Sequence, residues 1–343
     1  MSQRKPPTSV DVARRAGVSQ TTVSLVFREA SSKRVGEATR DRVLAAAREI
    51  GYQPNHSARS LRQRRTNLIG LATTVYTSYS LGLVAAARRA ALAGGRQLVV
   101  LGAEDEDASL AALDLVARGT VDALILSPHG DRSMAEAVRT AALGRPVVLA
   151  GPRTDPRLPA VLLDLEAAGR IATEHLVSLG HRRIAFVTPP RTTTDGRRAG
   201  YRAVLGQHGL EAEDQVVVSE DHTARAGHRA VSDLLEHGAQ PRPTALFTYN
   251  EELAIGAVAA ARDHGLVVGT DLAVVGCNDS PISEFLSPPL TSIALPGQEA
   301  GRRAVELAMA QDDPAHGQVE HVVLAPQLNV RESSVGPLGS DSR

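Results

Sequence analysis

Lysine, cysteine and long apolar runs are scarce in this 343-residue chain. The only lysines are Lys5 and Lys33, so the rest of the chain cannot supply a phosphate-loop or Schiff-base lysine. The single cysteine, Cys277, excludes an internal disulfide framework and a cysteine metal cluster. No apolar run is long enough to span a membrane, and the basic N-terminus MSQRKPPTSV lacks the apolar stretch of a signal peptide. We therefore expect a soluble, cytoplasmic protein.

Motifs of common α/β enzymes are also missing. Neither G-x-G-x-x-G nor G-x-S-x-G occurs in the sequence. The histidines are scattered without zinc-ligand spacing, and His175, His181, His222 and His228 are expected at the surface. We expect no catalytic residues, no cofactor and no bound metal. The length allows two or three domains with real cores.

Charge is distributed unevenly along the chain. Residues 1–67 hold fourteen lysines and arginines against five acids, a net charge of +9, so the remainder carries −9 in a chain that is neutral overall. A small basic domain of this kind is expected to bind a polyanion, because neutralising phosphates releases their counterions and supplies affinity. The N-terminal segment is therefore a candidate nucleic-acid-binding domain.

Within that segment, residues 10–27 (VDVARRAGVSQTTVSLVF) predict two short helices joined by a tight turn. We expect Ser9 to cap the first helix, Gly17 to form the turn and Ser19 to cap the second helix. The first helix should bury a face made of Val10, Ala13 and Ala16. The second should bury Val23 and Val26 and present Gln20, Thr21, Ser24 and Leu25. This pattern is typical of a helix-turn-helix, whose second helix enters the DNA major groove. An ordinary helical hairpin is the alternative, which the excess of positive charge disfavours.

A third helix is expected to end at Gly51, and Pro54 prevents it from resuming. Asn55 can cap a short segment, HSARSLRQ, that is too brief to form a stable isolated helix. We expect it to fold only on a partner; the alternative is a flexible basic linker.

From Leu68 onward, apolar strands alternate with helices. LIGLA, QLVVLG, VDALILS and RPVVLAG form one series, and a second begins at RRIAFVT. This alternation predicts parallel sheets covered on both faces, in two lobes over residues 68–165 and 166–330 with crossovers. A ligand should bind beyond the carboxyl ends of the strands.

From about Thr8 to Ser333 the chain resembles the LacI/GalR-type transcriptional regulators. The N-terminal motifs that carry the resemblance are DVARRAGVSQTTVS, TRDRVLAAAREIGYQPN and ARSLR. Further along they are GRIATEHLVSLGHRRIAFV, AGYRAVL, YNEELAIGAVAAARDHGL, VVGCND and PPLTSI. The resemblance implies an all-α helix-turn-helix headpiece (residues 1–54) and a hinge helix with linker (55–67). It also implies a two-lobed periplasmic-binding-protein-like α/β domain for effector binding and dimerisation (68–333), followed by a disordered tail (334–343).

The resemblance also implies residues that bind double-stranded DNA. Those in the headpiece are Thr8, Ser19, Gln20, Thr21, Thr22, Ser24, Leu25 and Arg28. Those in the hinge are Asn55, Ala58, Arg59 and Leu61, with Leu61 as a wedge in the minor groove or, alternatively, packed against its dimer mate. Leu25 stands where many members have arginine, and Arg28 where many have asparagine. Leucine cannot read guanine through paired hydrogen bonds, so the operator should differ at that base.

For the effector, Arg197 and Asn250 match the family's arginine and asparagine, which could donate hydrogen bonds to vicinal hydroxyls. Asn278 takes the place of a common aspartate. Tyr79, in the altered loop VYTSYSL, is expected as an aromatic floor, and His129 on the opposite wall. The lost carboxylate leaves an unusual sugar, an acidic metabolite or a nucleoside-like compound open as the ligand.

We expect a homodimer, or a larger assembly, that represses transcription from a pseudo-palindromic operator under control of a sugar-like effector. Whether the effector releases DNA or strengthens binding is left open. One alternative is a soluble sugar-binding transport component, which does not explain the +9 segment. Another is an α/β enzyme with a fused DNA-binding domain, which the missing motifs disfavour. No membrane partner is expected.

Overall fold

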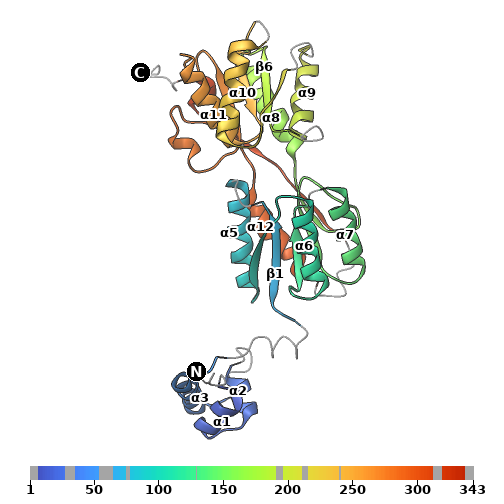
Figure 1. The fold of residues 1–343 in the computed structure, drawn as a ribbon, viewed down its shortest axis with the longest axis vertical. Helices are drawn as coiled ribbons and strands as arrows, with labels where there is room; N and C mark the ends of the chain where they lie inside the picture. The colour runs from blue at the N-terminus through green and yellow to red at the C-terminus, as the bar shows by residue number, and fades with distance from the viewer. Residues whose placement is uncertain are drawn as a thin grey trace, which may run out of the picture. The chain divides into compact units, whose positions relative to one another are not determined.

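The chain divides into two units, Met1–Thr66 and Asn67–Arg343, in the computed structural model (Figure 1). The structure describes residues 7–27, 35–53, 65–74, 78–128, 130–190, 196–210, 215–238, 241–311 and 319–336. Six residues with predicted binding roles lie outside these ranges: Arg28, Asn55, Ala58, Arg59, Leu61 and His129. No helix in the part of the chain that is described is long and apolar enough to cross a membrane.

The first unit contains three helices: α1 (Ser9–Ala16), α2 (Gln20–Val26) and α3 (Glu37–Ile50). Gly17 adopts φ 65° between α1 and α2, and Gly51 adopts φ 68° after α3, a left-handed conformation that glycine enters without steric cost. Val12, Val23 and Val43, one from each helix, are buried and form the centre of the core. The predicted helix-turn-helix and the end of the third helix are confirmed.

Two details at the start of α1 differ from the sequence-based expectation. The N-cap is Thr8 rather than Ser9, because Thr8 and Asp11 form a reciprocal capping box. The Thr8 N–H donates to the Asp11 carboxylate over 2.9 Å, and the Thr8 Oγ1 accepts from the Asp11 N–H over 3.4 Å. Val10 is 47 % exposed, so Val12 rather than Val10 supplies the apolar contact to the core.

The second unit contains two sheets, each with six strands among the described residues. The first has the order β11-β5-β4-β3-β1-β2, and all its pairs are parallel. Its strands are β1 (Leu68–Thr73), β2 (Gln97–Gly102), β3 (Ala123–Leu126), β4 (Val147–Gly151), β5 (Ala160–Leu163) and β11 (His321–Leu324). The second has the order β12-β10-β9-β8-β6-β7, with β12 antiparallel. Its strands are β6 (Ile184–Thr188), β7 (Gln215–Val218), β8 (Ala245–Thr248), β9 (Ala273–Asn278), β10 (Thr291–Ala294) and β12 (Gln327–Asn329).

Helices cover both faces of each sheet. Figure 1 shows α5 (Ser78–Ala93) beside α12 (Gly297–Ala310), and α6 (Glu106–Ala117) beside α7 (Asp131–Ala142). Alternate residues of β1 point to the two sides: Leu71 packs with α5 and α12, whereas Ala72 packs with α6 and α7. The second sheet lies likewise between two helix pairs, α8 (Leu165–Ser178) with α9 (Gly196–Gln207) and α10 (Ala224–His237) with α11 (Glu251–Asp263). The predicted α/β fold with helices on both faces is confirmed.

The chain crosses between the two lobes three times, after β5, after β10 and after β11. Helix α12 and strand β11 therefore belong to the first lobe, although they follow most of the second lobe in sequence. The helices of three pairs, α5 with α12, α8 with α9 and α10 with α11, approach closely at glycines. A Cβ on Gly169 of α8 would lie 2.0 Å from the Arg197 carbonyl oxygen of α9, and one on Gly301 of α12 would lie 2.1 Å from the Leu83 carbonyl oxygen of α5.

Two histidines expected at the surface have structural roles instead. His175 and His181 are half-buried. The His175 Nε2 lies 2.9 Å from the Ser334 Oγ, and the His181 Nδ1 lies 2.9 Å from the Thr244 Oγ1. These hydrogen bonds connect elements distant in sequence, which the sequence pattern did not show.

Candidate functional site

Helix α2 presents a polar face in the basic unit. Gln20 and Thr21 are exposed and Leu25 is half-buried, whereas Val23 and Val26 are buried against α1 and α3. The expected division of this helix into an apolar inner face and a polar outer face is confirmed. Its outer face can therefore contact a partner without disturbing the core.

Hydrogen bonds at the start of α2 hold this face in place. The Ser19 Oγ accepts from the Thr22 N–H over 3.1 Å, which confirms the predicted cap, and lies 2.9 Å from the Thr22 Oγ1. The Gln20 amide donates to the Ser9 Oγ over 2.9 Å, so Ser9 connects α1 to α2 instead of capping α1. Thr8 uses its hydroxyl to donate to the Asp11 carboxylate over 2.7 Å.

In the second unit, polar and aromatic side chains gather where the strands of the second sheet end. Arg197, the second residue of α9, is 5 % exposed, and its guanidinium carbon lies 4.2 Å from the centroid of the Tyr249 ring. Its Nε donates to the Cys277 Sγ over 3.4 Å. Tyr249 directly follows β8, and Cys277 is near the end of β9. Three segments thus meet at one guanidinium group, in a cation–π arrangement.

Both polar atoms of the Asn250 side-chain amide form hydrogen bonds within the protein. Its Oδ1 accepts from the Leu253 N–H over 3.0 Å and caps α11. Its Nδ2 donates to the His222 carbonyl oxygen over 3.0 Å. Asn250 therefore holds the loop that carries His222 at the start of α11.

The His222 ring packs edge-on against Tyr249, with the ring centroids 5.5 Å apart and an interplanar angle of 62°. Partial burial lowers the pKa of His222; the Asp221 carboxylate opposes this shift and the positive charge of Arg197 adds to it. The imidazole is consequently neutral near pH 7, with one nitrogen able to donate and the other able to accept. His222 was expected to be a surface residue; the residue is exposed, as expected, and its ring also packs into this cluster.

Asn278 ends β9 with φ 101° and is 8 % exposed. The next residue, Asp279, has φ 51°, and its carboxylate accepts from the Arg331 Nη1 over 2.6 Å and from the Asn329 Nδ2 over 2.5 Å. Asp279 therefore connects the end of β9 to the C-terminal segment. Its charge is satisfied within the protein.

Tyr79 lies near the start of α5 and packs against the hydrophobic cores of both lobes. It also contacts the crossover after β10, where a Cβ on Gly297 would lie 2.4 Å from the Tyr79 carbonyl oxygen. Its phenol oxygen is buried without a hydrogen-bond partner among the described residues, and burial raises its pKa well above the usual range. Because a buried hydroxyl of this kind has already lost its hydration, it can form a hydrogen bond to a ligand without a further desolvation cost of its own.

The structure thus brings Arg197 and Asn250 into one cluster next to Asn278, joined through Tyr249, His222 and Cys277. Reasoning from sequence missed these last three residues as neighbours of the site. Tyr249 directly precedes Asn250 in TYNEE, which was the available signal. Cys277 directly precedes Asn278 in VVGCND, which was the equivalent signal, whereas His222 had none, because its proximity depends on the strand order of the sheet.

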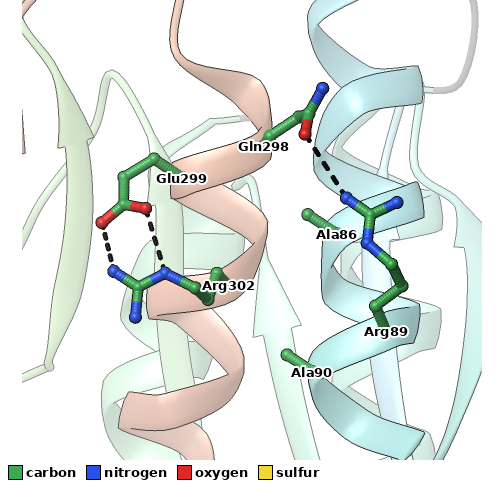
Figure 2. A pocket seen from close by; sticks show the side chains of 6 residues that line it. All are labelled: Ala86, Arg89, Ala90, Gln298, Glu299 and Arg302. Carbon is green, nitrogen blue, oxygen red and sulfur yellow. Dashed lines mark hydrogen bonds and ion pairs between the residues drawn. The ribbon is translucent and has the colours of Figure 1, made fainter.

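A groove between α5 and α12 lies outside this cluster. It is lined by Ala86, Arg89, Ala90, Gln298, Glu299 and Arg302. Figure 2 shows that its polar side chains bond to one another: the Arg302 Nε donates to Glu299 over 3.0 Å, and the Arg89 Nη2 donates to Gln298 over 3.4 Å. None of the predicted effector residues lines it, so we do not assign the effector to this groove.

Comparison with known proteins matches both units. Residues 9–55 match the family model "Bacterial regulatory proteins, lacI family", and residues 173–334 match "Periplasmic binding protein-like domain". The HTH-type transcriptional regulator CelR of Thermobifida fusca is 34 % identical, over 97 % of this chain and 100 % of the relative. The ribose operon repressor of Escherichia coli is 32 % identical, over 95 % and 99 %.

Solved structures of similar proteins span nearly the whole chain. A lac repressor dimer bound to operator and an anti-inducer superposes with a TM-score of 0.82 at 28 % identity, covering 97 % of this chain and 100 % of that one. A complex of CelR with cellobiose superposes with a TM-score of 0.70 at 30 % identity, covering 95 % and 99 %. The expected fold, a helix-turn-helix followed by a two-lobed periplasmic-binding-protein-like domain, agrees with both.

Proposed function

Because the chain belongs to the LacI family of bacterial regulatory proteins, we propose that it is a sequence-specific transcriptional repressor whose operator affinity is switched by a small-molecule effector. It acts in the cytoplasm as a binding protein and not as an enzyme. The headpiece comprises residues 1–54, the hinge 55–67 and the effector-binding domain 68–333. Ser334, expected to begin a disordered tail of residues 334–343, is instead part of the folded domain, because it is buried in α13 (Glu332–Val335) and its Oγ lies 2.9 Å from the His175 Nε2.

The observation that carries this proposal is the exposed polar face of α2 in a unit of high positive charge. Gln20 and Thr21 project from a capped helix whose other face is buried. Side chains placed in this way read base edges in the major groove, and arginines and lysines around them neutralise phosphates. Ser19, Thr22, Ser24 and Thr8 contact the backbone. Arg28, Asn55 and Arg59 also bind the DNA, and Ala58 and Leu61 lie in the minor groove, with Leu61 as the wedge that parts a base step.

The effector binds at the strand ends of the second sheet, between the two lobes. Arg197, Asn250 and Asn278 supply hydrogen bonds, and Tyr79 and His129 supply flanking rings. The relatives support a sugar-like ligand, since they include a ribose operon repressor and a regulator solved with cellobiose. A ligand of this kind changes operator affinity only when it binds the two conformations of the protein with different affinity.

The functional unit is a homodimer, which would place two headpieces on a pseudo-palindromic operator. Ile282 and Phe285 support this assignment, because they are 55 % and 79 % exposed around the 3-10 turn η3 (Ser283–Phe285). The Glu251 carboxylate holds this turn by accepting from the Ser280 N–H over 3.2 Å and from the Ser283 hydroxyl. Apolar side chains held rigidly in solvent are typical of a contact surface.

Selection of binding sequences from a pool of random duplexes tests the proposal. The full chain should enrich a pseudo-palindromic sequence, and a chain lacking residues 1–64 should enrich none. Leu25→Arg should shift the preferred base at one position per half-site toward guanine, without weakening binding to random DNA. Failure of the full chain to enrich any sequence would overturn the proposal, and enrichment by the truncated chain would overturn the domain assignment.

A further inference from the structure

Asn67, the first residue of the second unit, is held from both sides at the point where β1 begins. Its N–H donates to the Asp122 Oδ2 over 2.8 Å, and its carbonyl oxygen accepts from the Gln97 N–H over 2.9 Å. Asp122 directly precedes β3 and Gln97 opens β2, the two strands that flank β1. The backbone of Asn67 has φ 58°, a left-handed conformation that asparagine tolerates better than most residues.

A buried ion pair supports this junction. The Arg96 Nη1 lies 3.1 Å from the Asp122 Oδ2, the same oxygen that accepts from Asn67. The two side chains are only 8 % and 11 % exposed. The Arg96 N–H donates to the Ala91 carbonyl oxygen in the last turn of α5, and the Asp122 N–H donates to the Leu68 carbonyl oxygen of β1. Arg96 thus connects the end of α5, through Asp122, to the entry of the chain into β1.

Net stability is a poor explanation for a buried pair at this position. Moving two charges out of water costs several kcal/mol per ion, and apolar replacements of similar volume are often equally stable. Other ion pairs of the same lobe are exposed to solvent, for example Arg118–Asp114 at 74 % and 50 %. The buried pair instead fixes the positions of the groups around Asn67, because charged hydrogen-bonding groups accept few alternative arrangements.

We propose that Arg96 is a positioning residue for operator binding, acting through Asp122 on the backbone of Asn67. This inference rests on the proposed function, because it concerns how the α/β unit holds the chain that leads to the DNA-binding unit. A junction held in one conformation reduces the entropy lost when paired headpieces engage two half-sites. Binding to random DNA depends mainly on phosphate contacts from the headpiece and does not require that order.

The test uses the full chain and the duplex that it selects from a random pool. In the double variant Arg96→Met/Asp122→Leu, both charges are replaced by apolar groups, so the fold is retained while the contact to Asn67 is lost. We expect affinity for the selected duplex to fall about tenfold or more and affinity for a random duplex to change less than about twofold. Asn67→Pro removes the same N–H and cannot adopt φ 58°, so it should give the same result with the ion pair intact.

Two further variants separate positioning from general stability. Arg96→Lys keeps a positive charge beside Asp122. It should therefore retain most of the wild-type difference in affinity between the selected and the random duplex, which the double variant loses. Arg303→Met removes an arginine of the same lobe that bonds to Glu306 and Glu320, distant from β1 in sequence, and should leave that difference unchanged. Thermal melting of each variant reports whether the α/β unit is folded.

The outcomes are distinguishable. If the wild-type chain selects no sequence, the proposed function fails and this inference fails with it. If the wild type selects a sequence and both the double variant and Asn67→Pro retain its full preference over random DNA, the inference alone is overturned. A matching loss in Arg303→Met would also overturn it, because the effect would then follow any loss of an ion pair.

Discussion

The guanidinium group of Arg197 stacks on the ring of Tyr249, with 4.2 Å between the guanidinium carbon and the ring centroid. The two residues come from different segments, the start of α9 and the end of β8. Stacking on the ring restricts the orientation of the guanidinium group, and the Cys277 sulfur accepts its Nε–H. A cation oriented in this way is pre-organised for the effector binding that we propose for Arg197.

Tyr249→Leu should therefore weaken ligand binding, whereas Tyr249→Phe should not. Cation–π stacking contributes about 1 kcal/mol, so loss of the ring should weaken affinity about fivefold. The ligand for this measurement is a sugar that raises the melting temperature of the wild type in a screen, titrated by calorimetry. Equal affinities for the leucine and phenylalanine variants would show that the ring does not orient Arg197.

Thr8→Ala should destabilise the headpiece, because Thr8 and not Ser9 caps α1. Removing a threonine or serine N-cap costs about 1 kcal/mol, so the free energy of unfolding of the DNA-binding unit should fall by about that amount. Ser9→Ala is the matched control and should cost less, since it removes only the hydrogen bond from Gln20. Denaturant melts followed by NMR signals of the headpiece give both values; a larger loss in the Ser9 variant would contradict the cap assignment.

Gly169→Ala should damage both the packing of α8 on α9 and the proposed effector site. The added Cβ would lie 2.0 Å from the Arg197 carbonyl oxygen, so the start of α9 must move. We expect a loss of stability of about 1–3 kcal/mol, as for other overpacked positions, and weaker ligand binding. The melting temperature and a ligand titration measure the two effects, and an unchanged melting temperature would show that the helices separate freely.

Acidification should destabilise the second unit through His175 and His181. Burial lowers the pKa of both rings from 6.5, and for His175 the nearby His181 adds to the shift. The unfolded chain therefore binds protons first as the pH falls below 6.5, and the free energy of unfolding decreases there. Above that pH both rings are neutral in the folded and the unfolded chain, so this loss of stability does not occur.

His175→Gln combined with His181→Gln should reduce this pH dependence, because glutamine can replace the hydrogen bonds without titrating. Urea melts of the wild type and the double variant between pH 5 and pH 8 provide the comparison. Parallel curves over that range would show that other groups control the acid sensitivity.

Local features of the chain were predictable from sequence, and features that depend on distant neighbours were not. The turn at Gly17, the cap at Ser19 and the buried face of α2 follow from residue spacing within a few positions. The apolar strands separated by helices indicated two parallel sheets with both faces covered. The cap of α1 was misplaced by one residue, because both Thr8 and Ser9 can cap and only the reciprocal bond to Asp11 distinguishes them.

The sequence by itself determined the class of the molecule: a basic helix-turn-helix joined to a two-lobed α/β domain. Hydrophobic periodicity, turn residues and charge are local features of the sequence, so they can be recognised without knowing the fold. Only the tertiary structure decided that Arg197 contacts Tyr249 and Cys277, and that Arg96 and Asp122 meet beside Asn67. The hydrogen-bonded pair Arg96–Asp122 is separated by 26 positions in the sequence, and the pair Arg197–Cys277 by 80. Such contacts depend on the order of the strands in each sheet, which a local sequence pattern does not reveal.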